Sequence, residues 1–286
     1  MKFTKLQGTG NDFVLVETGD ERRDWSKLAL AMCERHFGIG SDGLLLLLPS
    51  ESADFRMRMF DPDGSEAEAC GNGIRCLARY VYDRGMVPAG ADHISVETIA
   101  GVRQLKLYKK SGKLISVQAG MGEPRFNAEE IPAKIEQSRG LITYTGNMIG
   151  YPVKVAGIDM LLNLVSMGNP HAVYFQKKPV VNFPLSQVGP EVEHSSLFPR
   201  RTNFEVARVV NEKEIEVRTW ERGVGETLAC GSGACAVAVA ARLHGYTGNK
   251  VNIKLLGGTL QLEWDGAGEV LMTGPAETVF NGEWPD

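Results

Sequence analysis

Short segments that alternate apolar and polar residues recur along the chain, and this alternation is typical of β-strands with one buried face. The run Leu44–Leu48 is apolar throughout and ends at Pro49, which predicts a buried strand. We therefore expect most of the fold to be β-sheet. The clearest of the other strand segments are Phe13–Val16, Phe55–Phe60, Ile94–Thr98 and Glu214–Arg218.

Two segments predict helices instead, Ile74–Arg84 and Ala234–Leu243, and a glycine follows each at the usual stop position of a helix. The second segment is almost wholly apolar, so its helix should be buried on most of its sides. Strands wrapped around a central helix satisfy both patterns.

The chain contains an internal repeat with an offset of 160 residues. Arg58–Gly85 aligns without a gap on Arg218–Gly245, with eight identities in 28 positions, and both copies contain Ala-Cys-Gly-x-Gly. We infer two copies of one domain, the first over residues 1–122 and the second over 123–274, with a Pro- and Gly-bearing hinge between them.

Composition and charge favour a globular protein and argue against nucleic-acid and membrane partners. With 43% apolar and 23% charged residues, the 286-residue chain has the balance of a globular protein. A net charge of −4 without a Lys/Arg tract argues against nucleic acid as a partner. No apolar run approaches the ~18 residues that span a bilayer, and no secretory signal is recognisable. We expect a cytoplasmic protein with no membrane partner.

Each repeat places one cysteine, Cys70 or Cys230, directly before Gly-x-Gly at the expected start of its helix. The N–H groups and the dipole at a helix start stabilise negative charge, so they lower the pKa of a thiol and bind anions. If the two domains face each other, the thiols flank one ligand. One then takes a proton from a carbon acid while the other delivers a proton to the opposite face, as inversion of a stereocentre requires.

Cysteines also form disulfides, fill apolar cores and bind metals, and each of these roles competes with an acid/base role. Five cysteines are an odd number, which a pure disulfide framework explains poorly. Cys33, Cys76 and Cys235 are expected to be small buried apolar residues. A zinc ion could be held by Cys70 with Cys76 or by Cys230 with Cys235. Structural zinc sites usually space their cysteines by two to four residues, and a cysteine four or five helical positions further on would be drawn into the core. We therefore expect no metal.

Two further polar segments accompany the cysteines. Glu221 and Arg222 precede the second cysteine, where an acid and a forked cation either hold an ammonium and a carboxylate or form a surface ion pair. The segment Gly168–His171 predicts a tight turn with a polar tip, and its histidine is either structural or functional.

Six motifs stand in a characteristic order and spacing: Gly8–Phe13, Asp63–Glu66, Cys70–Cys76, Met167–His171, Trp220–Thr227 and Ala229–Cys235. Together they closely resemble the diaminopimelate epimerase family, and the resemblance extends from Lys5 to Ala276.

The resemblance implies an α+β fold of two pseudo-symmetric domains. Each is a β-sheet or barrel wrapped around a central helix, residues 275–286 return to the first domain, and the active site lies in the interdomain cleft. It also implies a homodimeric isomerase that uses no pyridoxal phosphate and no metal. The implied reaction interconverts LL- and meso-2,6-diaminopimelate for lysine and peptidoglycan synthesis.

The resemblance also implies residue roles. Cys70 and Cys230 would be the two acid/base thiols, and His171 and Glu221 would modulate their proton affinity. The residues expected to bind substrate are Gly71, Asn72, Gly231 and Ser232 through the helix starts, and Asn11, Asn169, Asn203, Glu221 and Arg222 elsewhere.

Two positions depart from the family pattern. Asp61 stands where the family commonly has Asn, and Gly43 stands where many members have a substrate-contacting Gln. An ionised Asp61 would repel a substrate carboxylate. We therefore expect Asp61 to bind the substrate's ammonium, to cap the turn that follows it, or to alter the distal specificity.

Two alternative functions share the cysteine motifs. One is a cofactor-independent racemase of another amino acid, of the histidine or proline type, and the other is a thiol redox or metal-binding module without catalysis. Arg222, Asn169 and Asn203 favour a substrate with a second polar end, and so favour the epimerase.

Overall fold

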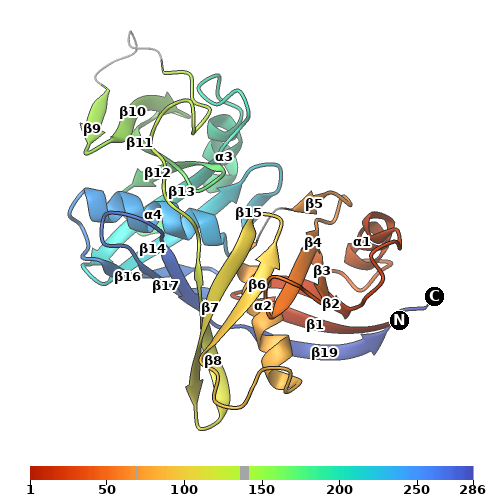
Figure 1. The fold of residues 1–286 in the computed structure, drawn as a ribbon. Helices are drawn as coiled ribbons and strands as arrows, with labels where there is room; N and C mark the ends of the chain where they lie inside the picture. Colours follow the sequence, from red (N-terminus) through yellow and green to blue (C-terminus); the bar gives the residue numbers. More distant parts are fainter. Residues whose placement is uncertain (68–69, 136–141, 286) are drawn as a thin grey trace. The chain divides into compact units, whose positions relative to one another are not determined.

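The computed structural model describes residues 1–67, 70–135 and 142–285. The chain divides into two compact units, unit 1 (Met1–Gly120 with Thr273–Asp286) and unit 2 (Met121–Met272). In each unit, strands pack against one long central helix (Figure 1). Ala69, the first residue of the shared cysteine motif in unit 1, lies outside the described residues.

Unit 1 is a sheet with the neighbour order β19–β1–β2–β3–β4–β6–β7–β8, and β5 pairs with β4. The pairs β2–β3 and β4–β6 are parallel and the others antiparallel. Helix α2 packs against strands from both ends of this order, including β8 and β19. The elements are β1 (Lys2–Gly8), β2 (Asn11–Glu17), α1 (Trp25–Cys33), β3 (Gly43–Leu48), β4 (Phe55–Phe60), β5 (Glu66–Ala67), α2 (Gly71–Asp83), β6 (His93–Thr98), β7 (Gly101–Lys110), β8 (Lys113–Gly120) and β19 (Glu277–Glu283).

Unit 2 repeats this arrangement with the order β9–β10–β11–β12–β13–β14–β16–β17, and β15 pairs with β14. Here β12–β13 and β14–β16 are the parallel pairs, and α4 is the central helix. The elements are β9 (Thr143–Thr145), β10 (Met148–Val155), β11 (Ile158–Ser166), β12 (Pro170–Phe175), η1 (Val180–Asn182), α3 (Leu185–Glu193), β13 (Asn203–Asn211), β14 (Glu214–Glu221), β15 (Gly225–Thr227), α4 (Gly231–Leu243), β16 (Lys250–Leu255) and β17 (Gly258–Glu263). Strand β18 (Leu271–Gly274) spans the boundary, with its first two residues in unit 2 and its last two in unit 1.

The last strand of the chain belongs to the unit with which the chain begins. In Figure 1, β19 lies beside β1, and the register runs from Lys2 opposite Glu283 to Gln7 opposite Glu277. The N–H of Trp284 also donates to the carbonyl of Met1 at 2.8 Å. Unit 1 is thus closed by residues that follow all of unit 2 in sequence.

The predicted strands and central helices are present, and the expectation of a sheet around a helix is confirmed. The all-apolar segment forms β3, whose residues are all buried. The helices begin at Gly71 and Gly231, directly after the cysteines that were expected at the helix starts and three residues before the helical runs that begin at residues 74 and 234. Glycine has a low helix propensity, but each preceding cysteine caps the helix with its side chain and fixes the first turn.

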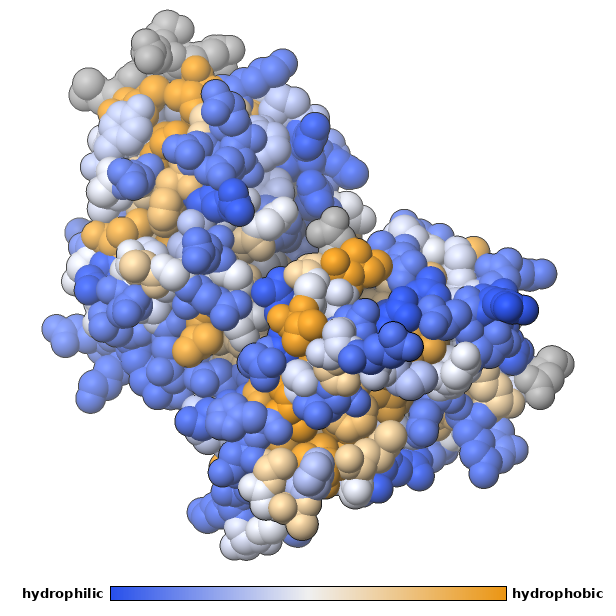
Figure 2. Space-filling model, in the orientation of Figure 1, coloured by the Kyte–Doolittle hydropathy of each residue, from blue (hydrophilic) through white to orange (hydrophobic). Residues whose placement is uncertain are grey.

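Burial of the central helix α4 explains why it is almost wholly apolar. In α4 every residue from Gly233 to Ala241 is buried, and its small side chains let the surrounding strands approach closely. The face of the molecule in Figure 2 is mainly hydrophilic, with smaller hydrophobic areas between the polar side chains. Among the residues that the structure describes, no helix is long and apolar enough to cross a membrane.

Candidate active site

Cys70 takes the N-cap position of α2. Its backbone is extended (φ −140°, ψ 117°), and its Sγ accepts a hydrogen bond from the N–H of Gly73 at 3.4 Å. The half-buried thiol therefore lies at the positive end of the helix dipole, where a thiolate is stabilised.

Asn11 lies beside this thiol. Its Oδ1 is 4.0 Å from Sγ of Cys70 and accepts a hydrogen bond from Nδ2 of Asn72 at 3.1 Å. Its own Nδ2 donates to Oδ2 of Asp42 at 2.7 Å, so the amide oxygen faces the thiol. The structure thus brings Asn11, Asn72 and Cys70 together, and Gly71 follows as the first helical residue.

Asp42 was not predicted as a site residue, and its role depends on a charge network. Arg35 Nη2 donates to Oδ1 of Asp42 at 2.7 Å and to Oδ1 of Asp12 at 2.9 Å. Lys5 forms an ion pair with Asp12. The network holds the carboxylate of Asp42 where it orients the amide of Asn11.

Asp61 directly follows β4, at the end where Gly43 begins the paired β3. The turn after Asp61 is capped by Asp63, whose Oδ1 accepts from the N–H and the hydroxyl of Ser65 at 2.9 and 2.6 Å. The expectation that Asp61 caps this turn is therefore wrong: its carboxylate accepts no hydrogen bond from the described residues. Burial, and secondarily the charge of Asp63, raises the pKa of Asp61.

Cys230 occupies the corresponding place at the start of α4. Its Sγ accepts from the N–H of Gly233 at 3.3 Å and lies 3.5 Å from Oγ of Ser232. Burial raises the pKa of this thiol well above its usual value, and the carboxylates of Glu221 and Glu205 raise it further. The Ser232 hydroxyl and the Gly233 N–H act in the opposite direction.

Glu221 ends β14 and occupies the repeat position equivalent to Asp61. The hydroxyl of Thr227 donates to its Oε1, and burial raises the pKa of the Glu221 carboxyl. Each repeat therefore places a carboxyl with a raised pKa nine residues before its cysteine.

Asn203 joins two of the predicted segments through backbone groups. Its Oδ1 accepts from the N–H of Arg222 at 2.9 Å, and its Nδ2 donates to the carbonyl of Pro170 at 3.0 Å. These bonds tie the turn before His171 to the loop that carries Arg222. The guanidinium of Arg222 donates to the carbonyl of Arg200 at 3.3 Å.

His171 forms a buried pair that sequence reasoning missed. Its Nδ1 lies 2.8 Å from Oε1 of Glu205, and neither side chain is exposed to solvent. Its Nε2 lies 2.9 Å from Oδ1 of Asn169, whose Nδ2 donates to Oγ of Ser232 at 3.3 Å. One signal in the sequence was available: Glu205 is a lone acid within the apolar strand Asn203–Asn211.

Cys76 and Cys235 lie within the helices and are fully buried in the two cores. Burial raises the pKa of the Cys76 thiol to about 12, so this thiol stays protonated at neutral pH. Their place in the core is the one expected for small apolar residues.

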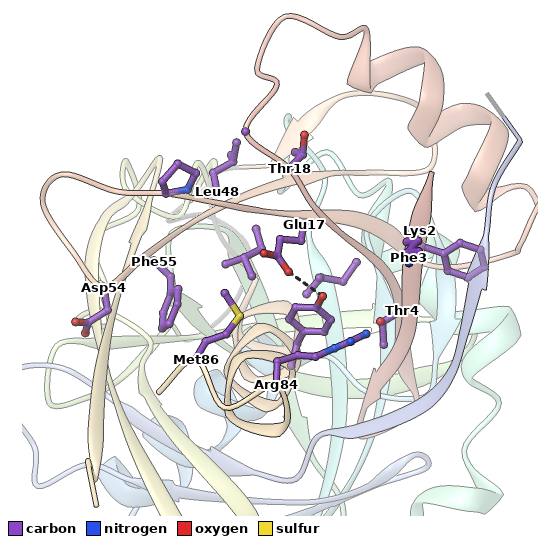
Figure 3. A pocket seen from close by; sticks show the side chains of 15 residues that line it. Lys2, Phe3, Thr4, Glu17, Thr18, Leu48, Asp54, Phe55, Arg84 and Met86 are labelled. Atoms are coloured by element: carbon purple, nitrogen blue, oxygen red, sulfur yellow. Dashed lines mark hydrogen bonds between the residues drawn. The ribbon is translucent and has the colours of Figure 1, made fainter. Parts of the chain in front are cut away.

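A separate cleft of about 700 Å³ lies in unit 1 toward the carboxyl end of α2 (Figure 3). In it Tyr80 donates to Oε2 of Glu17 at 3.1 Å, and the guanidinium carbon of Arg84 lies 5.2 Å from the centre of the Tyr80 ring. None of the predicted site residues lines this cleft. The candidate chemistry of unit 1 is therefore at the opposite, amino end of the helix.

Solved structures of two other kinds of protein share the fold of this chain. A phenazine biosynthesis protein of the PhzF family from Bacillus anthracis is 16% identical, with a TM-score of 0.69 over 100% of this chain and 99% of that one. A probable proline racemase from Agrobacterium radiobacter is 13% identical, with a TM-score of 0.68 over 99% of this chain and 92% of the other. At these identities the similarity concerns the fold alone.

Sequence comparison then identifies the family. The diaminopimelate epimerase family model matches residues 3–127 and 163–279. Curated diaminopimelate epimerases are similar over nearly their whole length: that of Pelotomaculum thermopropionicum is 49% identical over 100% of this chain and 99% of its own. That of Methanococcus maripaludis is 46% identical, covering 99% of both chains. The chain belongs to the diaminopimelate epimerase family.

Proposed function

We propose that this protein interconverts LL- and meso-2,6-diaminopimelate by a two-base mechanism that uses Cys70 and Cys230. The observation that supports this most strongly is the equivalent placement of one cysteine as the cap of the central helix in each unit. We further propose that the enzyme acts in the cytoplasm as a homodimer and without a cofactor, as its family membership suggests.

The chemistry needs two groups that exchange protons with one α-carbon. A thiolate removes the α-proton and the other thiol returns a proton to the opposite face, so the configuration inverts and the enzyme ends with its protons exchanged. This requires one substrate molecule to contact both helix starts. The first-turn amides that begin at Gly71, Asn72, Gly231 and Ser232 suit the α-carboxylate, which gains negative charge as the proton leaves.

The remaining polar residues suit the rest of the substrate. Asn11 presents an amide oxygen beside Cys70, which can accept from the α-ammonium. Arg222 can pair with the distal carboxylate, while Asp61 and Glu221 can accept from ammonium groups. Asn169 and Asn203 complete the set of proposed substrate-binding residues.

The test is the conversion of LL- to meso-diaminopimelate in deuterated water, with α-proton exchange followed by NMR beside it, for wild type and for the Cys70→Ala and Cys230→Ala variants. Each variant should lose at least about 100-fold in epimerisation while keeping its far-ultraviolet circular dichroism, since a general acid or base contributes ~10²–10⁴-fold. Cys33→Ala, which removes a buried thiol outside the site, is the matched control.

Retention of activity within about tenfold in either site variant would overturn the two-thiol mechanism, because no acid–base partner would then be missing. Faster exchange with proline or histidine than with diaminopimelate would instead replace the substrate and keep the mechanism.

A further inference from the structure

The pair His171–Glu205 is a buried acid beside a titratable ring. Only one carboxylate oxygen of Glu205 is used: Oε1 meets Nδ1 of His171 at 2.8 Å, whereas Oε2 is buried with no hydrogen-bond partner among the described residues. Burying an ionised carboxylate costs desolvation free energy, which destabilises the fold unless a cation neutralises the charge. Within the described part of the chain, His171 is the basic side chain that contacts it.

The fold does not require this acid, because the repeat in unit 1 does without it. The Cα of Gly233 faces Glu205, such that an added Cβ would lie 2.6 Å from Oε1. The equivalent Gly73 faces Leu45, with Cδ2 at 3.1 Å from the corresponding point. Leu45 and Glu205 therefore occupy the same position against their central helices, one apolar and the other ionisable.

The histidine has an apolar counterpart as well. In the parallel pair β2–β3, Phe13 lies opposite Gly43, two residues before Leu45. In the parallel pair β12–β13, His171 lies opposite Asn203, two residues before Glu205. The fully buried residues Phe13 and Leu45 of unit 1 thus correspond to the His171–Glu205 pair of unit 2.

The two repeats also turn an equivalent asparagine in opposite directions. In unit 1, Asn11 directs its amide oxygen toward Asn72 and the thiol of Cys70. In unit 2 the oxygen of Asn169 faces Nε2 of His171, so its amide nitrogen faces Ser232. The orientation of each asparagine amide therefore depends on which side chain faces its oxygen, and in unit 2 this side chain is His171.

We propose that Glu205 is a positioning residue that keeps the His171 ring protonated on both nitrogens, so that a one-way chain of hydrogen-bond donors runs to Cys230. The steps are Nδ1–H of His171 to Glu205, Nε2–H to Oδ1 of Asn169, Nδ2–H to Oγ of Ser232, and the Ser232 hydroxyl to Sγ. The proposal rests on the proposed function, in which Cys230 must become a thiolate.

The hydrogen-bond chain gives the buried thiolate of Cys230 a second donor, in addition to the N–H of Gly233. Cys230 faces the carboxylates of Glu221 on β14 and Glu205 on β13 and the N–H of Gly233 on its own helix. The His171 ring on β12 pairs with Glu205 at 2.8 Å. The carboxylates oppose ionisation of the thiol, while the serine hydroxyl favours it only when its proton points at sulfur. Ordering of that proton is what the Glu205 carboxylate contributes.

The sign of a pH shift separates this role from a simple charge effect. In Glu205→Gln the ring becomes neutral. With its remaining proton on Nδ1, which the ¹⁵N shifts of the ring report, Nε2 accepts from Asn169, and the reversed amide then takes the hydroxyl proton of Ser232 away from Cys230. The acid limb of kcat/KM should move up by about one pH unit, with roughly tenfold lower kcat/KM below it. Loss of a negative charge alone would move the acid limb down.

The matched control is Glu216→Gln, which removes a carboxylate paired with Arg208 and should leave the acid limb in place.

Two further measurements test the proposal even if Glu205→Gln does not fold. In wild type labelled with ¹⁵N-histidine, one ring should show both nitrogens protonated at neutral pH, and this signal should be absent in His171→Gln. The double variant His171→Phe/Glu205→Leu copies unit 1 and should fold with an unchanged Tm while losing at least about tenfold in kcat/KM.

A downward or absent shift in Glu205→Gln whose ring proton is on Nδ1, a neutral His171 ring in wild type, or an unfolded double variant would each overturn the proposal. Activity retained by Cys230→Ala would instead remove the proposed function on which it rests, and the two failures are therefore distinguishable.

Discussion

At the scale of single residues, Asp61 combines a cost in stability with a proposed role in binding the substrate. Its carboxylate is half-buried and its pKa is raised, first by burial and then by the charge of Asp63. A carboxyl whose pKa is higher in the folded than in the unfolded state destabilises the protein once it is ionised. The equivalent Glu221 shows the same shift, so both repeats carry this burden at the same position.

Asp61→Asn should therefore raise Tm at neutral pH. The advantage should shrink as pH falls through the raised pKa and vanish well below 3.8, the usual pKa of aspartate, where the wild-type carboxyl is protonated in both states. If Asp61 accepts from a substrate ammonium, the same variant should raise KM for LL-diaminopimelate severalfold. Thermal scans across pH and initial rates measure the two effects. Asp83→Asn, on the far end of α2, is the control. A lower KM with unchanged Tm would contradict both parts.

At the scale of elements, the starts of α2 and α4 share a sequence but differ in what packs over them. The last glycine of each Cys-Gly-x-Gly motif lies in the first helical turn, where its N–H bonds the cysteine sulfur. In α2 it faces the flexible end of Leu45, and in α4 it faces the carboxylate of Glu205. A methyl group at Gly233 has less room than one at Gly73, because the Glu205 carboxylate is held in place by His171.

Gly233→Ala should therefore be more damaging than Gly73→Ala, although the sequence change is the same. The methyl in α4 displaces Glu205 and with it the His171 ring, at a cost of about 1–3 kcal/mol for overpacking, together with loss of activity. In α2 a shift of the Leu45 side chain relieves the contact, so the loss should be smaller. Chemical denaturation and kcat of both variants provide the comparison; equal effects would show that the packed residue does not matter.

At the scale of the whole molecule, unit 1 depends on the C-terminal residues. Strand β19 pairs with β1 and packs on α2, and the buried guanidinium of Arg75 in that helix donates to the carbonyl of Pro275 at 3.3 Å. Unit 2 contains its own complete sheet and core within Met121–Met272. The two units should therefore respond differently to loss of the C-terminus.

Deletion of residues 275–286 should lower hydrogen-exchange protection in β1 and α2 by at least about tenfold, because the buried edge of β1 loses its partner. Protection in α4 should change much less. Exchange measured peptide by peptide in the full chain and the truncated chain decides this. A uniform loss in both helices would mean that the units do not unfold separately.

The sequence by itself determined the features that depend on local pattern. Alternation marks the strands because successive side chains point to opposite faces, and an apolar run with a glycine stop marks each central helix. The repeated Cys-Gly-x-Gly motif placed Cys70 and Cys230 at helix starts, and the six family motifs indicated the epimerase. These signals are contained within short segments, so they need no knowledge of the contacts between them.

Only the tertiary structure decided the contacts that tune the site. Asn11 and Asp42 are separated by 31 residues, and His171 and Glu205 by 34, and each pair meets because two strands lie parallel in a particular register. The structure likewise gave the turn cap to Asp63 instead of Asp61. Register and packing are set by the whole sheet. The positions that hold Phe13 and Leu45 in unit 1 therefore hold the buried polar pair His171 and Glu205 in unit 2.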